Sequence, residues 1–145
     1  MTVKTSTGLR NAMLDTGSFK SVMNSAKLII YGGGSVPATA DDAVSGTALV
    51  TITGPSAAAL AWDTAALAGI IAKAPGQTWS GTCTAGTANY YRLVNSSDTG
   101  ALSTTQPRIQ GTVDVAGADL NLSSTTFTGG ATQTIDYYTV AFPSG

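Results

Sequence analysis

Residues able to do chemistry are few in this sequence. The chain has eight aspartates and one cysteine, and it contains neither glutamate nor histidine. Without an imidazole, neither a Ser-His-Asp triad nor a Cys-His pair can be assembled. One thiol with no imidazole also argues against the usual zinc sites. We therefore expect no catalytic residue, no metal ligand and no cofactor, and a protein that is not an enzyme.

Four of the aspartates lie in or beside turns, where a carboxylate can bind a ligand or stabilise the turn. Asp41 and Asp42 can accept hydrogen bonds from nearby main-chain N–H groups. Ca²⁺ binding and a contact with a partner are the alternatives for this pair, although the spaced oxygen ligands of a calcium loop are missing. Asp114 and Asp119 flank the turn at Gly117. For them turn stabilisation is favoured over a glycosidase pair, which would need two carboxyl groups across a cleft.

The cysteine and the aromatic residues are the other candidates for a site. Cys83 has threonine neighbours and no basic one, so we interpret it as a small buried residue rather than a reactive thiol. Six aromatic residues could form a platform for a sugar ring, but we favour packing in a core otherwise built from small residues. Subunit contact and glycan contact are the alternatives. These residues are Trp62, Trp79, Tyr90, Tyr91, Tyr137 and Tyr138.

Composition limits the fold and the partners. Ala, Thr, Ser and Gly account for 76 of the 145 residues, which favours thin β-structure with many turns over helices. The net charge is −1, and no Lys or Arg cluster is present, so we expect neither nucleic acid nor a membrane as a partner. The longest apolar region, 57–72, is interrupted by Asp63 and is too short for a membrane span. The N-terminus lacks the apolar segment of a secretory signal, so we expect a soluble protein made in a cytoplasm.

We expect the rest of the chain to be arranged around the stretch 27–53. Its two apolar runs, Leu28–Tyr31 and Ala48–Ile52, predict strands. A polar connection of sixteen residues joins them, and its Gly32-Gly33-Gly34 and Pro37 favour an ordered loop rather than a helix.

Later segments extend the β pattern. About eight short strands separated by turns predict an all-β domain, either a β-sandwich or a jelly roll of antiparallel strands. In one of them, Gly111 indicates a bulge or a close approach of another chain segment. The remaining predicted strands cover Thr78–Thr84, Thr87–Val94, Gln106–Val115, Asp119–Leu122 and Gln133–Phe142.

Two segments are not clearly β. Apolar residues between Thr7 and Ala26 recur every three to five positions, which predicts a short amphipathic helix or two turns broken at Gly17. Residues 1–26 are thus expected to form an N-terminal arm, and residues 27–145 the sandwich domain. Residues 55–74 could form a helix, which propensity favours, or two strands over 57–62 and 67–73. Candidate caps for the first segment are Ser6, Thr7, Asp15 and Ser18.

The sequence LIIYGGGSVPATADDAVSGTALVTIT resembles a family of small tailed-bacteriophage virion proteins, in which the early strand reads roughly L-x-IY-x-G-x-x-P-x-x-AD-x-A-x-x-G-x-x-L. The resemblance covers about four-fifths of the chain, and it fits less well over 11–26 and 57–73. It implies strands in 57–73. Its motifs are turn and strand signals rather than a catalytic signature. Further matching pieces are GTA at 86–88 with YYRL at 90–93, GTV at 111–113, GADLNL at 117–122 and YTVAFP at 138–143.

This resemblance implies a virion structural protein made in the host cytoplasm. A capsid decoration or cement subunit, bound to the major capsid protein or another virion structural protein, is the function we expect. A tail, collar or baseplate adaptor and a glycan-binding sandwich module are the alternatives. Because only 15 formal charges are available to protect strand edges, we also expect a homo-oligomer. Its candidate interface residues are Leu9, Met13, Phe19, Met23, Tyr137 and Tyr138.

Overall fold

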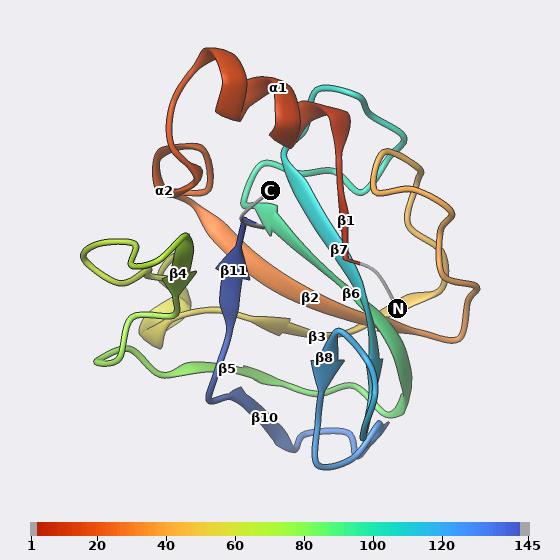
Figure 1. Cartoon of the computed structure of the whole chain (residues 1–145). Coiled ribbons are helices and arrows are strands. Elements are labelled where there is room, and N and C mark those ends of the chain that lie inside the picture. Colours follow the sequence, from red (N-terminus) through yellow and green to blue (C-terminus); the bar gives the residue numbers. More distant parts are fainter. Residues whose placement is uncertain (1–2, 143–145) are drawn as a thin grey trace.

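The computed structural model describes residues 3–142, so the ends of the predicted arm and domain, 1–2 and 143–145, lie outside the described residues. Strands dominate, and two short α-helices and one 3₁₀ turn complete the structure (Figure 1). The predicted all-β, sandwich-like class is confirmed. The elements in chain order are β1 Lys4–Thr5, α1 Thr7–Asp15, α2 Phe19–Val22, β2 Ala26–Gly32, β3 Thr47–Ile52, η1 Pro55–Ala57, β4 Ile70–Ala72, β5 Trp79–Thr82, β6 Gly86–Asn95, β7 Arg108–Asp114, β8 Leu120–Asn121, β9 Thr126–Phe127, β10 Thr132–Ile135 and β11 Thr139–Ala141.

The main sheet is built around the strand that follows the helices. Its order is β1-β7-β6-β2-β3, with β9 added to β6 and β8 added to β7. Neighbours along this order are antiparallel, whereas β8 runs parallel to β7, unlike the antiparallel pairing predicted throughout. Two smaller pairs, β10 with β5 and β11 with β4, complete the described strands. In Figure 1, β11 crosses in front of the main sheet and therefore belongs to a second layer of the fold.

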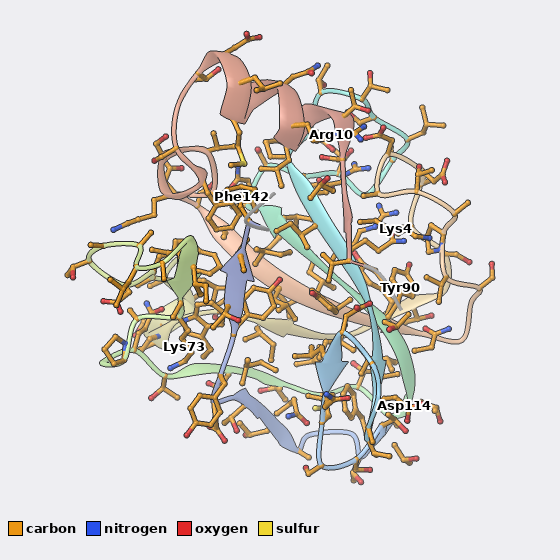
Figure 2. The ribbon with its side chains drawn as sticks, viewed as in Figure 1. Lys4, Arg10, Lys73, Tyr90, Asp114 and Phe142 are labelled. Carbon is orange, nitrogen blue, oxygen red and sulfur yellow. The ribbon has the colours of Figure 1, made fainter. Side chains whose placement is uncertain are left out.

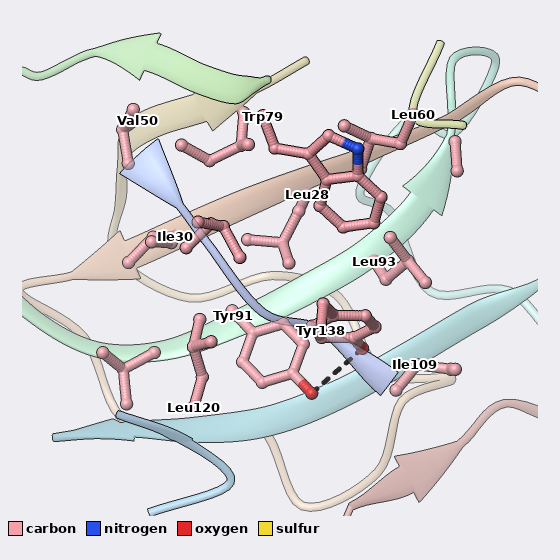
Figure 3. Packing of buried hydrophobic residues seen from close by; sticks show 14 of the residues in the cluster. Leu28, Ile30, Val50, Leu60, Trp79, Tyr91, Leu93, Ile109, Leu120 and Tyr138 are labelled. Carbon is pink, nitrogen blue, oxygen red and sulfur yellow. Dashed lines mark hydrogen bonds between the residues drawn. The ribbon is translucent and has the colours of Figure 1, made fainter. Parts of the chain in front are cut away.

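One face of the main sheet carries the hydrophobic core. Leu28, Ile30 and Leu93 project from it and are fully buried, and Trp79 of β5 packs over them (Figure 3). Trp79 meets Trp62 edge to face, with ring centroids 5.3 Å apart. Burying one large apolar side chain stabilises a fold by roughly 1.5–3 kcal/mol, so these few bulky residues compensate for the many small ones.

The N-terminal segment packs on this same core. Ser6 and Ser18 begin the two helices, each accepting a hydrogen bond from a main-chain N–H three residues later. Of the two predicted alternatives, one helix or two turns broken at Gly17, the structure shows the second, because α1 ends at Asp15 and α2 begins at Phe19. Leu9, Phe19 and Met23 then insert into the core beside the sheet.

Residues 55–74 contain neither the predicted α-helix nor both predicted strands, because only the second of them, predicted over 67–73, forms a strand, β4. The helix is absent apart from the single turn η1, and only β4 is a strand; 57–62 contributes one isolated bridge, at Trp62. One contributing side chain comes from outside the segment. Gln77 accepts a hydrogen bond from the Ala61 N–H and donates one to the Ala59 carbonyl, so these two main-chain groups bond to a side chain rather than to a partner strand.

The predicted final strand, Gln133–Phe142, is in fact two strands. β10 pairs with β5 and β11 pairs with β4, and residues 136–138 join them without ladder pairing. At this junction Tyr138 turns into the core. The alternation of the sequence was correct within each half, but it cannot show that the two halves pair with different strands.

Candidate functional site

Asp41 and Asp42 form hydrogen bonds within the chain. Both carboxylate oxygens of Asp41 accept from Thr7, one from its N–H at 2.8 Å and one from its hydroxyl at 2.6 Å. Asp42 accepts from the Thr39 N–H at 2.8 Å. Asp41 thereby ties the long loop between β2 and β3 to the first turn of α1. Among the described residues, no three His, Cys, Asp or Glu side chains gather as metal ligands would.

Asp114 and Asp119 support the region around the Gly117 turn, as expected. Asp114 accepts from the next N–H, and Asp119 accepts from both the N–H and the hydroxyl of Thr112. Gly111 also meets its expectation, because an added Cβ there would lie 2.6 Å from Cε1 of Tyr91. The main chain therefore approaches an aromatic ring at this point.

The aromatic residues do not assemble a stacking platform. Trp62, Trp79, Tyr90, Tyr91 and Tyr138 are buried, which agrees with the packing interpretation. The remaining member, Tyr137, is 90% exposed and stands apart from them. Cys83 is also buried, and desolvation raises the pKa of its thiol. Both observations agree with the interpretation of Cys83 as a packing residue.

Tyr91 and Tyr138 form a neutral pair inside the core. Their hydroxyl oxygens lie 3.2 Å apart (Figure 3). Burial raises the pKa of Tyr91 to about 12 and holds the pKa of Tyr138 well above its ordinary value. The pair therefore stays protonated at neutral pH and satisfies two polar groups that would otherwise be buried without partners.

Two buried arginines were missed by sequence reasoning. Arg108 is fully buried and pairs with Asp98, Nε to Oδ2, at 2.6 Å. It also donates to carbonyls of the loop between β2 and β3, at Ala40, Asp41 and Asp42. Arg92, on the adjacent strand, donates to the Gln110 side chain at 2.8 Å. Burial, and then the charge of Arg108, lower the pKa of Arg92. The sequence did contain a signal for this burial: both arginines lie within alternating β-runs, and such runs place one set of side chains on a face that another segment covers.

The predicted interface residues fall into two groups. Leu9, Phe19, Met23 and Tyr138 are buried in the core of their own chain and have little surface left for a second copy. The N-terminal helices close the core of the same chain, and the assignment of these four residues as intersubunit contacts stays a prediction. Met13 is partly buried, and Tyr137 is exposed. The predicted homo-oligomer itself stays a prediction.

A large groove lies between β1 and β11 and has a volume of about 850 Å³. Its floor is formed by the buried side chains of Tyr91, Ile109 and Leu120. Exposed Tyr137 and Phe142 lie at the two ends of the β11 side. Figure 2 shows Phe142 toward the same end of the molecule as Arg10, which also lines the groove.

A second hollow of about 480 Å³ shares Val140 and Phe142 with this groove, on the side where α1 and α2 lie. Its other apolar lining includes Met13, Phe19 and Ile71. The two hollows therefore flank β11, and the surface on this side of the molecule is uneven and largely apolar.

A scan against protein-family models, a search of curated proteins and a search of solved structures each return no match to this chain. Within residues 3–142, neither α-helix has the length and apolar character that would let it span a membrane. The candidate functional site is therefore the groove together with the strands that border it.

Proposed function

We propose that this chain is a non-enzymatic structural subunit of a tailed-bacteriophage virion, a capsid decoration protein that binds the assembled shell. The observation that carries the proposal is the groove between β1 and β11, whose apolar floor and strand walls suit a segment of another protein. The resemblance of 28–53 to virion proteins supports the setting. Those residues form β2, β3 and the loop to which Arg108 donates hydrogen bonds, so they belong to the structural framework of the fold.

Such a subunit would stabilise a capsid by mass action. A protein that binds the assembled shell, but not the free capsid subunits, lowers the free energy of the assembled state only. Interfaces of this kind typically bury about 1,200–2,000 Å² in total. The partner is the major capsid protein or another virion structural protein, and the place of action is the virion, after synthesis in the host cytoplasm.

The test is to quantify the protein in purified virions and to compare shells with and without it. We expect a copy number that follows the number of capsid subunits, and shells without the protein should release their contents at a lower temperature. Absence of the protein from purified virions would refute the proposal. A small ring-like copy number would assign it to a tail, collar or baseplate instead.

A further inference from the structure

We propose that the groove between β1 and β11 binds an extended segment of a partner protein, added as a strand antiparallel to both walls, with an acidic residue near the N-terminal end of that segment. The identity of the partner as a shell protein rests on the function proposed above. The chemistry of the ligand rests on the groove itself.

The β11 wall offers a free strand edge. Within residues 3–142, β11 pairs with β4 on one side only, with Thr139 opposite Ala72 and Ala141 opposite Ile70. Hydrogen bonds from Lys73 N–H to the Tyr138 carbonyl and from Phe142 N–H to the Gly69 carbonyl show which residues face β4. Since this direction alternates along a strand, the main-chain groups of Thr139 and Ala141 point toward the groove.

The β1 wall offers a second free edge. Among the strands that the structure describes, β1 ends the main sheet and pairs only with β7, with Lys4 opposite Gln110. The Ser6 N–H bonds to the Arg108 carbonyl, so the main-chain groups of Thr5 point away from β7. Val3 and Thr5 both line the groove. An unpaired edge is a template for another strand, and two edges lining one groove offer hydrogen bonds on both sides of it.

The direction of the two walls fixes the direction of the ligand. In Figure 1, β1 and β11 run the same way, toward the end of the molecule that carries α1. A strand antiparallel to both would enter at that end, where Arg10 and Phe142 lie. Alternate side chains of this strand would face the floor at Ile109 and Leu120, and the others would face solvent.

Charge and pairing identify the occupant. Arg10 is exposed and is the one basic residue among the described groove-lining residues, whereas the acidic one, Asp119, already accepts hydrogen bonds from Thr112. Arg10 therefore favours a carboxylate at the entry end. A second copy is disfavoured, because every described strand of this chain already pairs with a neighbour and so has at most one free edge. The groove takes a strand with two free edges, which a second copy could supply only by breaking one of its own strand pairs.

The test uses a peptide of about eight residues that alternates Val and Thr and carries an Asp near its N-terminus. Binding to the full chain is followed by calorimetry, and amide hydrogen exchange is read at Thr5, Thr139 and Ala141. We expect saturable binding that slows exchange at these three amides. A scrambled peptide with the same composition and a peptide with a central proline serve as controls.

Two pairs of variants test the two contacts. Thr139→Pro removes the outward N–H at an edge position that tolerates proline, and Thr139→Val retains that N–H. We expect about tenfold weaker peptide binding for the first variant and unchanged binding for the second. Arg10→Glu should weaken binding by about tenfold as well, whereas Arg10→Lys retains most of it. The unfolding free energy of each variant checks that it folds.

Three results would overturn the inference: no binding of the alternating peptide at millimolar concentration, equal binding of the proline peptide, or concentration-dependent protection of Thr139 and Ala141 in the protein alone. The last result would identify a second copy as the occupant. Shell binding that survives Thr139→Pro and Arg10→Glu would leave the proposed function standing without this groove. Peptide binding by a protein absent from virions would refute the proposed function alone.

Discussion

Arg108 is the side chain at which two long connections of the chain meet. Its guanidinium pairs with the Asp98 carboxylate and donates to the carbonyls of Ala101 and of the loop between β2 and β3. Two segments distant in sequence are therefore held against the sheet by one residue. A buried charge is stable only while its partners remain, so this residue should be sensitive to replacement.

We expect Arg108→Met to lower the free energy of unfolding by about 3–5 kcal/mol, because Asp98 is left buried without its partner. Urea denaturation at neutral pH measures the change. Arg10→Met, at an exposed position, is the control and should stay within about 0.5 kcal/mol of the parent. A loss below about 1 kcal/mol for Arg108→Met would mean that Asp98 reaches water when the pair is broken.

Tyr91 gives a prediction in the alkaline range. Its pKa is about 12 in the folded chain and 10.0 as the ordinary value, so the neutral hydroxyl is favoured in the folded state. This contribution is fully present below pH 10 and is lost as pH rises through 12, at about 1.4 kcal/mol per pH unit. Denaturation at successive pH values should therefore show a falling free energy of unfolding. Tyr91→Phe should make that fall less steep, and an unchanged slope would contradict the assignment.

At the scale of elements, the junction between β1, α1 and β7 depends on Ser6. Its hydroxyl oxygen accepts from the Leu9 N–H, as a helix cap, and from the Arg108 N–H, and the hydroxyl donates to the Gln106 carbonyl. One side chain thus joins the start of a helix to the strand pair beneath it. The neighbouring Gly8 lies so close to the Thr105 main chain that a Cβ would meet it at 2.4 Å.

We expect Ser6→Ala to cost about 2 kcal/mol, because it removes the cap and leaves buried N–H groups without acceptors. The matched control is Ser18→Ala, which removes the exposed cap of the short helix α2 and should cost less than about 1 kcal/mol. Both values come from urea denaturation. Equal costs for the two variants would show that Ser6 acts as a cap only.

At the scale of the whole molecule, two adjacent tyrosines face opposite environments. Tyr138 is in the core and contacts Tyr91 and Trp79, whereas Tyr137 projects into solvent beside the groove. A large exposed aromatic side chain beside apolar hollows is typical of a contact surface.

Substitution by serine should separate these roles. Tyr137→Ser should leave the free energy of unfolding within about 0.5 kcal/mol of the parent and weaken binding to shells. Tyr138→Ser should cost about 3–5 kcal/mol, as truncation of a buried aromatic side chain does. Thermal unfolding and a shell co-sedimentation assay provide the two measurements. A destabilised Tyr137→Ser variant would mean that its ring packs on the fold.

The sequence by itself determined the β class and most strand positions, and it gave two candidate caps for each helix start, of which Ser6 and Ser18 are used. These features depend on local causes: alternation of apolar residues, glycine and proline at turns, and serine at the caps. It also indicated that Asp114 and Asp119 stabilise a turn, because an aspartate beside a turn residue finds an N–H within a few positions.

Tertiary structure alone decided the features made by residues far apart in sequence. Gln77 determines the course of 58–61, and different partner strands divide 133–142. Arg108 is buried because a loop more than sixty positions away covers it. The groove is lined by residues of β1 and β11, which come from distant parts of the sequence. The periodicity of apolar residues indicates which side chains are covered. Which segment covers them depends on pairing energies summed over the whole chain.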